Sequence, residues 1–102
     1  MLTRSNAPAA TEPRIVAAVD YIIAQLRQVP DLNERARAIL AVRAEAVAHT
    51  DRFDSLLGET IIEMRQLDQP PTFAEIGEVL ALTASRVHQL HTEALTRATK
   101  KG

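Results

Sequence analysis

Two adjacent prolines, Pro70 and Pro71, divide the chain into a long N-terminal part and a short C-terminal part. Proline cannot continue a helix that arrives from upstream, so a helix before residue 70 must end there. Thr72 follows at once and Glu75 stands three residues later, which is the spacing of a capping box at the start of a new helix. The sequence therefore predicts a helical C-terminal unit that begins at Thr72.

Two short helices joined by a tight turn are predicted within this unit. Thr83 is a second N-cap candidate, and Gly77 is expected where two helices approach most closely. Apolar residues fall at helical spacing on one face of each helix: Phe73, Ile76 and Leu80 in the first, and Val87, Leu90 and Ala94 in the second. This pattern is the outline of a helix-turn-helix.

Residues 72–95 resemble the helix-turn-helix of region 4 of bacterial sigma factors. The shared pattern is a Thr-x-x-Glu-Ile-Gly opening, a Leu before the turn, Thr-x-x-Arg-Val-x-Gln-Leu, and a trailing Glu-Ala-Leu. The whole layout also resembles the small helix-turn-helix regulators with a sigma-like motif that are common in actinobacteria, in which long helices precede the DNA-reading unit. The resemblance implies binding to double-stranded DNA.

The chain departs from the sigma pattern at two places. Ala84-Ser85 stands where sigma factors commonly carry a charged Arg-Glu pair, so recognition of the promoter −35 element is not expected. Ala81 replaces the glycine usual in the turn, so either Ala81 adopts a left-handed conformation or the turn is built differently. Nothing in the chain resembles the sigma segments that melt the −10 element or bind the polymerase clamp.

The second helix of such a unit enters the major groove, and residues near its N-terminus meet the base edges. Gln89 is the strongest candidate for base reading, because its amide can bond adenine N6 and N7 together. Arg86 lies at the margin of the outward face, within reach of a phosphate. The candidate DNA-binding residues are Thr72, Thr83, Ala84, Ser85, Arg86, His88, Gln89, Thr92 and Arg97.

The N-terminal part is expected to hold a disordered arm over residues 1–13 and a helical dimerisation region over residues 14–69; residues 70–102 form the DNA-binding region. The first helix is predicted over residues 14–29 and ends at Pro30. Its apolar stripe is expected to contain Ile15, Ala18, Val19, Ile22, Leu26 and Val29, with Ile23 at the edge.

Asp31 and Glu34 form a second capping pair, which starts a helix that could run to Leu67. Gly58 is the only helix breaker in that stretch, so two arrangements stay open. A continuous helix would favour long dimerisation helices, whereas a break at Gly58 would fold the chain back into a helical hairpin. The first arrangement, a homodimer, is our preferred interpretation.

Composition limits the class of protein. Apolar residues make up 46% of the chain but only three residues are aromatic, which favours an all-α fold built from Ala, Leu, Ile and Val. There is no cysteine, no apolar run long enough for a membrane span and no signal-peptide pattern, so we expect a cytoplasmic protein. No catalytic constellation is present, so we expect no enzyme and no cofactor. His88 and His91 are three residues apart but lack a third ligand, so we expect no metal site.

The charge distribution favours two copies of the DNA-binding region acting together. Residues 72–102 hold 4 basic and 3 acidic residues, so one copy would gain little from counterion release. A sequence-specific transcriptional regulator that binds an inverted repeat as a homodimer is therefore our interpretation. The alternative is a helical protein-interaction module that binds RNA polymerase or another regulator.

Overall fold

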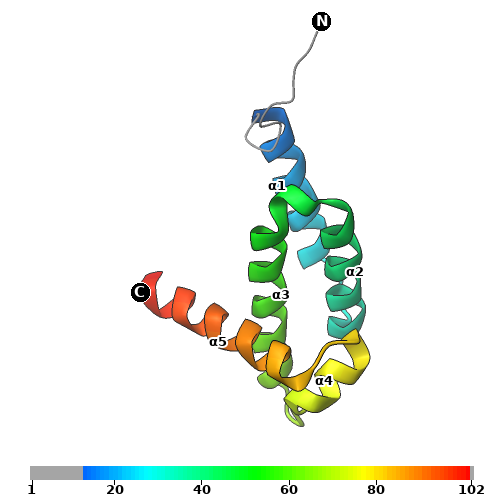
Figure 1. Ribbon diagram of the computed structural model, residues 1–102, viewed down its shortest axis with the longest axis vertical. Helices are drawn as coiled ribbons and strands as arrows, with labels where there is room; N and C mark the ends of the chain where they lie inside the picture. Colours follow the sequence, from blue (N-terminus) through cyan, green and yellow to red (C-terminus); the bar gives the residue numbers. More distant parts are fainter. Residues whose placement is uncertain (1–12, 102) are drawn as a thin grey trace, which may run out of the picture.

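The computed structural model describes residues 13–101, which form an all-α fold without a strand (Figure 1). The elements are α1 (Pro13–Arg27), α2 (Leu32–Glu45), the short 3₁₀ helix η2 (Val47–His49), α3 (Thr50–Arg65), α4 (Phe73–Leu80) and α5 (Ala84–Lys101). The predicted arm lies outside the described residues except for Pro13, which opens α1. Within the described range, no helix combines the length and the apolar character that crossing a bilayer requires.

The stretch after Asp31 is a helical hairpin, and the chain turns at Ala46 rather than at Gly58 (Figure 1). Ala46 leaves the helical region with φ −109° and ψ 61°, and η2 follows before α3 begins. The preferred continuous helix from Asp31 to Leu67 is therefore wrong, and so is the alternative position of the break at Gly58. No proline or glycine marks the turn, so the chain folds back because the two helices bury apolar side chains against each other.

The apolar stripe along this hairpin is buried within the chain. Its most enclosed members come from both helices: Ala36, Ile39, Phe53, Leu57, Ile61 and Met64. Burying each of the larger of these side chains contributes about 1.5–3 kcal/mol. The stripe that could have joined two long helices thus forms the core of one copy, and the hairpin alternative describes the fold.

Helix α1 packs on the hairpin through a face that differs from the predicted one. Val19, Ile23 and Leu26 are buried, so Ile23 lies at the centre of the contact rather than at its edge. Ile15 is 38% exposed and Tyr21 is 66% exposed, so both lie toward solvent. The helix is rotated because the period of its apolar residues fits two neighbouring faces nearly equally well.

A buried arginine fixes the connection between α1 and α2. Arg35 donates from Nε to the carbonyl oxygen of Val29 at 2.9 Å and from Nη1 to Glu63 Oε2 on α3 at 2.8 Å. The carboxylate of Glu63, whose side chain is 49% exposed, offsets part of the cost of burying the Arg35 cation, and the Val29 carbonyl accepts from a further donor. Arg35 therefore ties the α1–α2 junction to the second helix of the hairpin.

One hydrophobic core extends from the hairpin into α4 and α5. It therefore crosses the predicted boundary between the dimerisation region, which ends at residue 69, and the DNA-binding region, which begins at residue 70. Ile76, Leu80, Val87 and Leu90 belong to the same cluster as the buried residues of α2 and α3. Helix α5 crosses α3 at Gly58, where an added Cβ would lie 2.8 Å from both the Ala94 Cβ and the Leu90 carbonyl oxygen. Gly58 therefore permits the close approach of two helices and does not interrupt its own.

Candidate nucleic-acid interface

Side-chain caps begin both helices of the C-terminal unit, as the sequence predicts. The Thr72 hydroxyl accepts from the Glu75 amide at 3.1 Å, and the Glu75 carboxylate accepts from the Thr72 amide at 2.8 Å, which completes the capping box. The Thr83 hydroxyl accepts from the Arg86 amide at 3.0 Å. We call α4, α5 and the turn between them the reading head.

The turn of the reading head depends on Gly77 and Ala81. Ala81 adopts the left-handed conformation with φ 59° and ψ 40°, which is the first of the two possibilities that its side chain left open. The Gly77 carbonyl accepts from the amides of Ala81 and Leu82. A Cβ on Gly77 would lie 2.5 Å from the Leu82 carbonyl oxygen, so the close approach expected at this glycine is to the turn backbone.

The two sides of α5 differ as the helical spacing predicts. Val87, Leu90 and Ala94 are buried against α3 and α4. The opposite side is exposed and begins at the N-terminal end of the helix; it carries Ala84, Ser85, His88, Gln89 and Thr92. Helix α5 crosses α3, and its C-terminal half extends away from the other helices (Figure 1). The outward side is therefore accessible along the helix.

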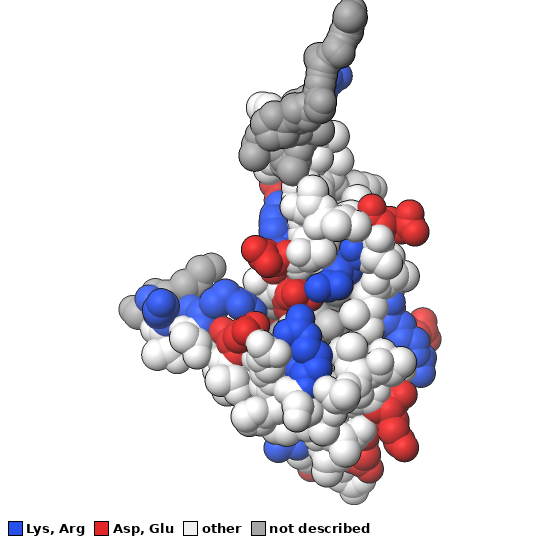
Figure 2. Space-filling model, in the orientation of Figure 1, with Lys and Arg blue, Asp and Glu red and all other residues white. Residues whose placement is uncertain are grey.

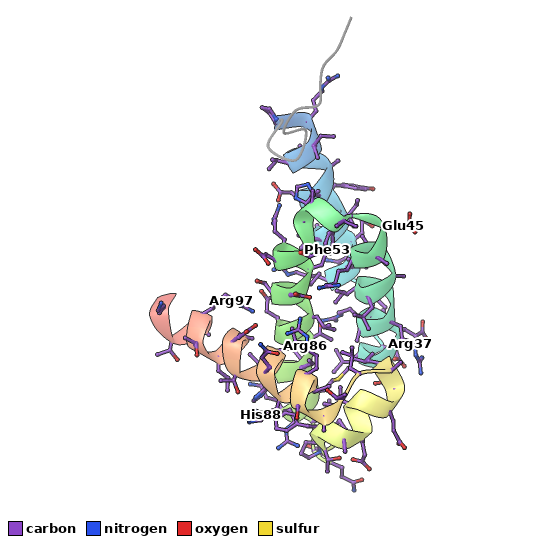
Figure 3. All side chains as sticks on the ribbon, in the orientation of Figure 1. Arg37, Glu45, Phe53, Arg86, His88 and Arg97 are labelled. Atoms are coloured by element: carbon purple, nitrogen blue, oxygen red, sulfur yellow. The ribbon has the colours of Figure 1, made fainter. Side chains whose placement is uncertain are left out.

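Arg86 is held by α3 instead of extending toward solvent. Its Nη2 lies 3.2 Å from Asp54 Oδ2, and the same carboxylate receives Arg43 Nε from α2 at 2.6 Å on Oδ1. Figure 3 shows Arg86 where α5 passes α3. A carboxylate distant in sequence therefore pairs with Arg86 in the unbound protein, and the predicted contact with a phosphate would require this pair to open.

Gln89 is also engaged within α5. Its Oε1 accepts from Arg86 Nη1 at 3.0 Å, and its Nε2 donates to Glu93 Oε2 at 3.3 Å. These contacts place Arg86, Gln89 and Glu93 in one row along the helix. The sequence alone indicates Arg86 and Gln89, but Asp54, Arg43 and Glu93 were missed as members of the network. Glu93 could have been found from its i, i+4 spacing to Gln89.

Phe73 joins the two histidines of the reading head. Its ring centre lies 5.1 Å from that of His88 and 5.2 Å from that of His91. The guanidinium carbon of Arg65, at the end of α3, lies 4.9 Å from the same ring centre. Burial lowers the pKa of His91 below its ordinary 6.5, and the positive charges of Arg65 and His88 act in the same direction. Among the described residues, no three His, Cys, Asp or Glu side chains are arranged to hold a metal ion.

The starts of α4 and α5, where the candidate residues Thr72 and Thr83 stand, differ in charge. At α4, the Glu75 carboxylate already occupies the Thr72 amide and places a negative charge there. At α5, no acidic residue stands in the first turn, so the start of this helix is the more favourable for a phosphate. Arg97 is exposed, but its Nη2 lies only 3.4 Å from the position of a Cβ on Gly58, so it reaches back over α3.

Basic and acidic side chains alternate across the face of the molecule in Figure 2, and no continuous basic surface covers it. The pairing of Asp54 with two arginines is one reason, since it removes their charge from solvent in part. Affinity for a phosphate backbone is therefore limited in a single copy.

A comparison with protein families matches residues 59–97 to Sigma-70, region 4. The match includes the second half of α3 together with α4 and most of α5, and so extends beyond the predicted helix-turn-helix into the helix on which it packs. Neither the curated proteins nor the solved structures give a match. Sigma region 4 is a non-catalytic, DNA-binding module. Residues 59–97 thus carry a sigma region 4-like helix-turn-helix, and this supports DNA binding by the chain.

Proposed function

We propose that this protein is a sequence-specific DNA-binding transcriptional regulator that inserts α5 into the major groove. The observation that carries the proposal is the outward side of α5. Neutral hydrogen-bonding side chains lie there, directly after a helix start that has no acidic residue in its first turn. Ser85, Gln89 and Thr92 are exposed on this side, while the other side is buried in the core. Side chains near the N-terminus of such a helix meet base edges.

Six of the nine candidate residues have roles that fit their chemistry directly. Gln89 pairs with an adenine, since its amide offers one donor and one acceptor at the spacing of N7 and N6. Ser85 and His88 each make one hydrogen bond to a base edge or a phosphate, and the Ala84 methyl group contacts a thymine methyl group. Thr83 and the amides at the start of α5 hold a backbone phosphate, and Thr72 makes a weaker contact because Glu75 lies beside it.

The regulator acts as a homodimer on an inverted repeat. Charge supports this, because residues 72–102 hold 4 basic and 3 acidic residues and the guanidinium of Arg86 is paired with Asp54. Two heads on one site raise the effective concentration of the second head and compensate for weak phosphate attraction. Three of the five large apolar side chains that lie exposed in the described residues belong to α1 and η2, far from α4: Ile15, Tyr21 and Val47, which is 72% exposed (Figure 1). We assign the dimer contact to these three side chains.

A second candidate function is a protein-interaction module that binds RNA polymerase or another regulator. The mixed charge of the molecule favours it, since a face without a basic surface suits a protein partner better than DNA (Figure 2). In that case the outward side of α5 would contact protein, and no duplex would be selected.

Selection of bound duplexes from a random library tests the proposed function. We expect the full-length protein to enrich one palindromic motif whose half-sites are about one helical turn, or a multiple of it, apart. Light scattering should give the mass of two chains at the concentrations used. Enrichment of no motif would contradict the proposal and favour the protein-interaction module. A motif with a single half-site, bound by a monomer, would retain DNA reading and reject the homodimer.

A further inference from the structure

We propose that Asp54 is a positioning residue for the reading head: it keeps Arg86 away from the DNA backbone and, through Arg86, orients the amide of Gln89 toward one base. The inference rests on the proposed function, because it assumes that Gln89 meets a base. It adds a residue on α3, outside the outward side of α5, to the determinants of specificity.

Asp54 lies where α2, α3 and α5 meet, and its side chain is 21% exposed. Its carboxylate oxygens accept from two arginines: Oδ1 lies 2.6 Å from Arg43 Nε, and Oδ2 lies 3.2 Å from Arg86 Nη2. Arg43 Nη2 also donates to Oδ2 at 3.4 Å. One carboxylate therefore serves two cations from two helices, and it fixes the guanidinium of Arg86 relative to the core.

The contact competes directly with a phosphate for Arg86. The carboxylate occupies Nη2, while Nη1 donates to Gln89 Oε1 at 3.0 Å. Charge-assisted hydrogen bonds of this kind are roughly twice as strong as neutral ones. Moving Arg86 to a phosphate would break the pair with Asp54 and the bond to Gln89 together. Arg86 therefore stays paired with Asp54, and it contributes little to non-specific DNA binding.

The network also determines which way the Gln89 amide faces. Arginine can only donate and an ionised carboxylate can only accept, so Oε1 must face Arg86 and Nε2 must face Glu93. In this orientation Oε1 keeps a second lone pair and Nε2 keeps a second N–H. These are the acceptor and the donor that the N6 amino group and N7 of adenine require. The Gln89 amide therefore already has, in the unbound protein, the orientation that pairing with adenine requires.

Loss of the Asp54 charge should lower the discrimination between duplexes and raise the affinity for DNA of any sequence. In Asp54→Asn the neutral amide no longer holds two guanidinium groups, so Arg86 can swing to a backbone phosphate and Gln89 loses its fixed orientation. Each added phosphate contact steepens the dependence of log K on log salt by about one. Discrimination against a duplex that lacks the adenine should fall about tenfold, within the range of a single bidentate base contact.

The experiment measures the affinity of the full-length protein for its selected duplex and for the same duplex with the adenine replaced, over a range of salt concentrations. The matched control is Asp20→Asn, which makes the same change in charge and breaks a 2.6 Å pair with Arg52 far from the reading head. A second variant, Arg86→Gln, breaks the network from the other side. We expect Asp54→Asn to lose discrimination and gain salt dependence, Arg86→Gln to lose discrimination only, and Asp20→Asn to change neither.

The outcomes separate the inference from the proposed function. If the wild type selects a duplex and Asp54→Asn matches Asp20→Asn in discrimination and in salt dependence, the inference is wrong and the proposed function stands. If the wild type selects no duplex, the proposed function fails and the inference fails with it. If thermal unfolding shows that Asp54→Asn no longer folds, Arg86→Gln decides: retained discrimination in that variant overturns the inference, and lost discrimination supports it.

Discussion

The reading head and α1 are attached to the same hairpin by different means. The reading head approaches the hairpin and its own turn so closely that Gly58 and Gly77 have no room for a side chain. Helix α1 is attached by three buried apolar side chains, and by exposed ion pairs that join Asp20 to Arg52 and Arg27 to Glu59. The head is therefore held by buried side chains and also by close approach of the backbone, whereas α1 is held by buried side chains and exposed ion pairs.

The difference fits the roles that we propose for the two regions. A base-reading helix must hold its side chains within a fraction of an ångström, and sites built on rigid elements achieve this better than mobile ones. Helix α1 needs only to present a surface, which tolerates small shifts. The comparison leads us to expect large effects from small changes in the backbone of the head, and effects in α1 that scale with the apolar area removed.

We expect the largest loss of stability from Gly77→Val, in the reading head. A Cβ at this position would lie 2.5 Å from the Leu82 carbonyl oxygen, which belongs to the backbone and cannot move aside cheaply. We expect the free energy of unfolding to fall by about 3 kcal/mol, at the upper end of the usual cost of overpacking. Urea denaturation measures it. The control is Ala74→Val on the exposed side of the same helix, which should cost less than about 1 kcal/mol. Equal losses in the two variants would show that the close approach does not matter.

A smaller effect is expected from Ile23→Ala in α1. Ile23 is 5% exposed, and we expect its truncation to cost about 2 kcal/mol, at the low end of the usual range of about 2–5 kcal/mol, because α1 can relax toward the space left. Ile15→Ala on the same helix is the matched control; because Ile15 is 38% exposed, its loss should stay below about 1 kcal/mol. Amide hydrogen exchange should show faster opening of α1 than of α5 in Ile23→Ala. Faster exchange throughout α5 instead would mean that α1 and the head are not held independently.

We expect Ala81→Gly to raise the free energy of unfolding, because it relieves strain in the turn of the reading head. Ala81 has φ 59°, a conformation that costs a residue with a side chain about 1–2 kcal/mol and costs glycine much less. Glycine is also more flexible in the unfolded chain, so we expect a net gain of about 0.5–1 kcal/mol in thermal or urea unfolding. The control, Ala74→Gly within α4, should lose about 1 kcal/mol. A loss in both variants would rule out relief of strain at the turn.

The smallest expected effect is a dependence of stability on pH that comes from the head. The pKa of His91 is lowered in the folded protein by burial, and by the charges of Arg65 and His88, so the folded state favours neutral His91. The contribution of this group to stability is therefore complete above the unfolded value of 6.5 and is lost as pH falls through the lower folded value. Unfolding measured from pH 7.5 to pH 5 should show a decline that is weaker in His91→Gln. A decline of the same size in both proteins would assign it to other groups.

Local signals in the sequence were enough to predict the reading head. The caps at Thr72 and Thr83, the turn at Ala81 and the buried side of α5 all depend on residues within a few positions of one another. The hairpin turn at Ala46 could not be predicted, because no breaker stands there and packing between helices decides it. The same holds for Asp54, which lies 32 residues from Arg86 and meets it only in the fold. The rotation of α1 was missed because adjacent faces of that helix are both apolar.

The central claim is that α5 reads bases through Gln89, and the affinity of Gln89→Ala for the selected duplex tests it most directly. The matched control is Gln25→Ala, which removes the same amide from an exposed position on α1. Our account predicts that Gln89→Ala weakens binding about tenfold or more on the selected duplex and no longer distinguishes it from a duplex without the adenine, while Gln25→Ala behaves as the wild type. Unchanged affinity and unchanged discrimination in Gln89→Ala would contradict the account.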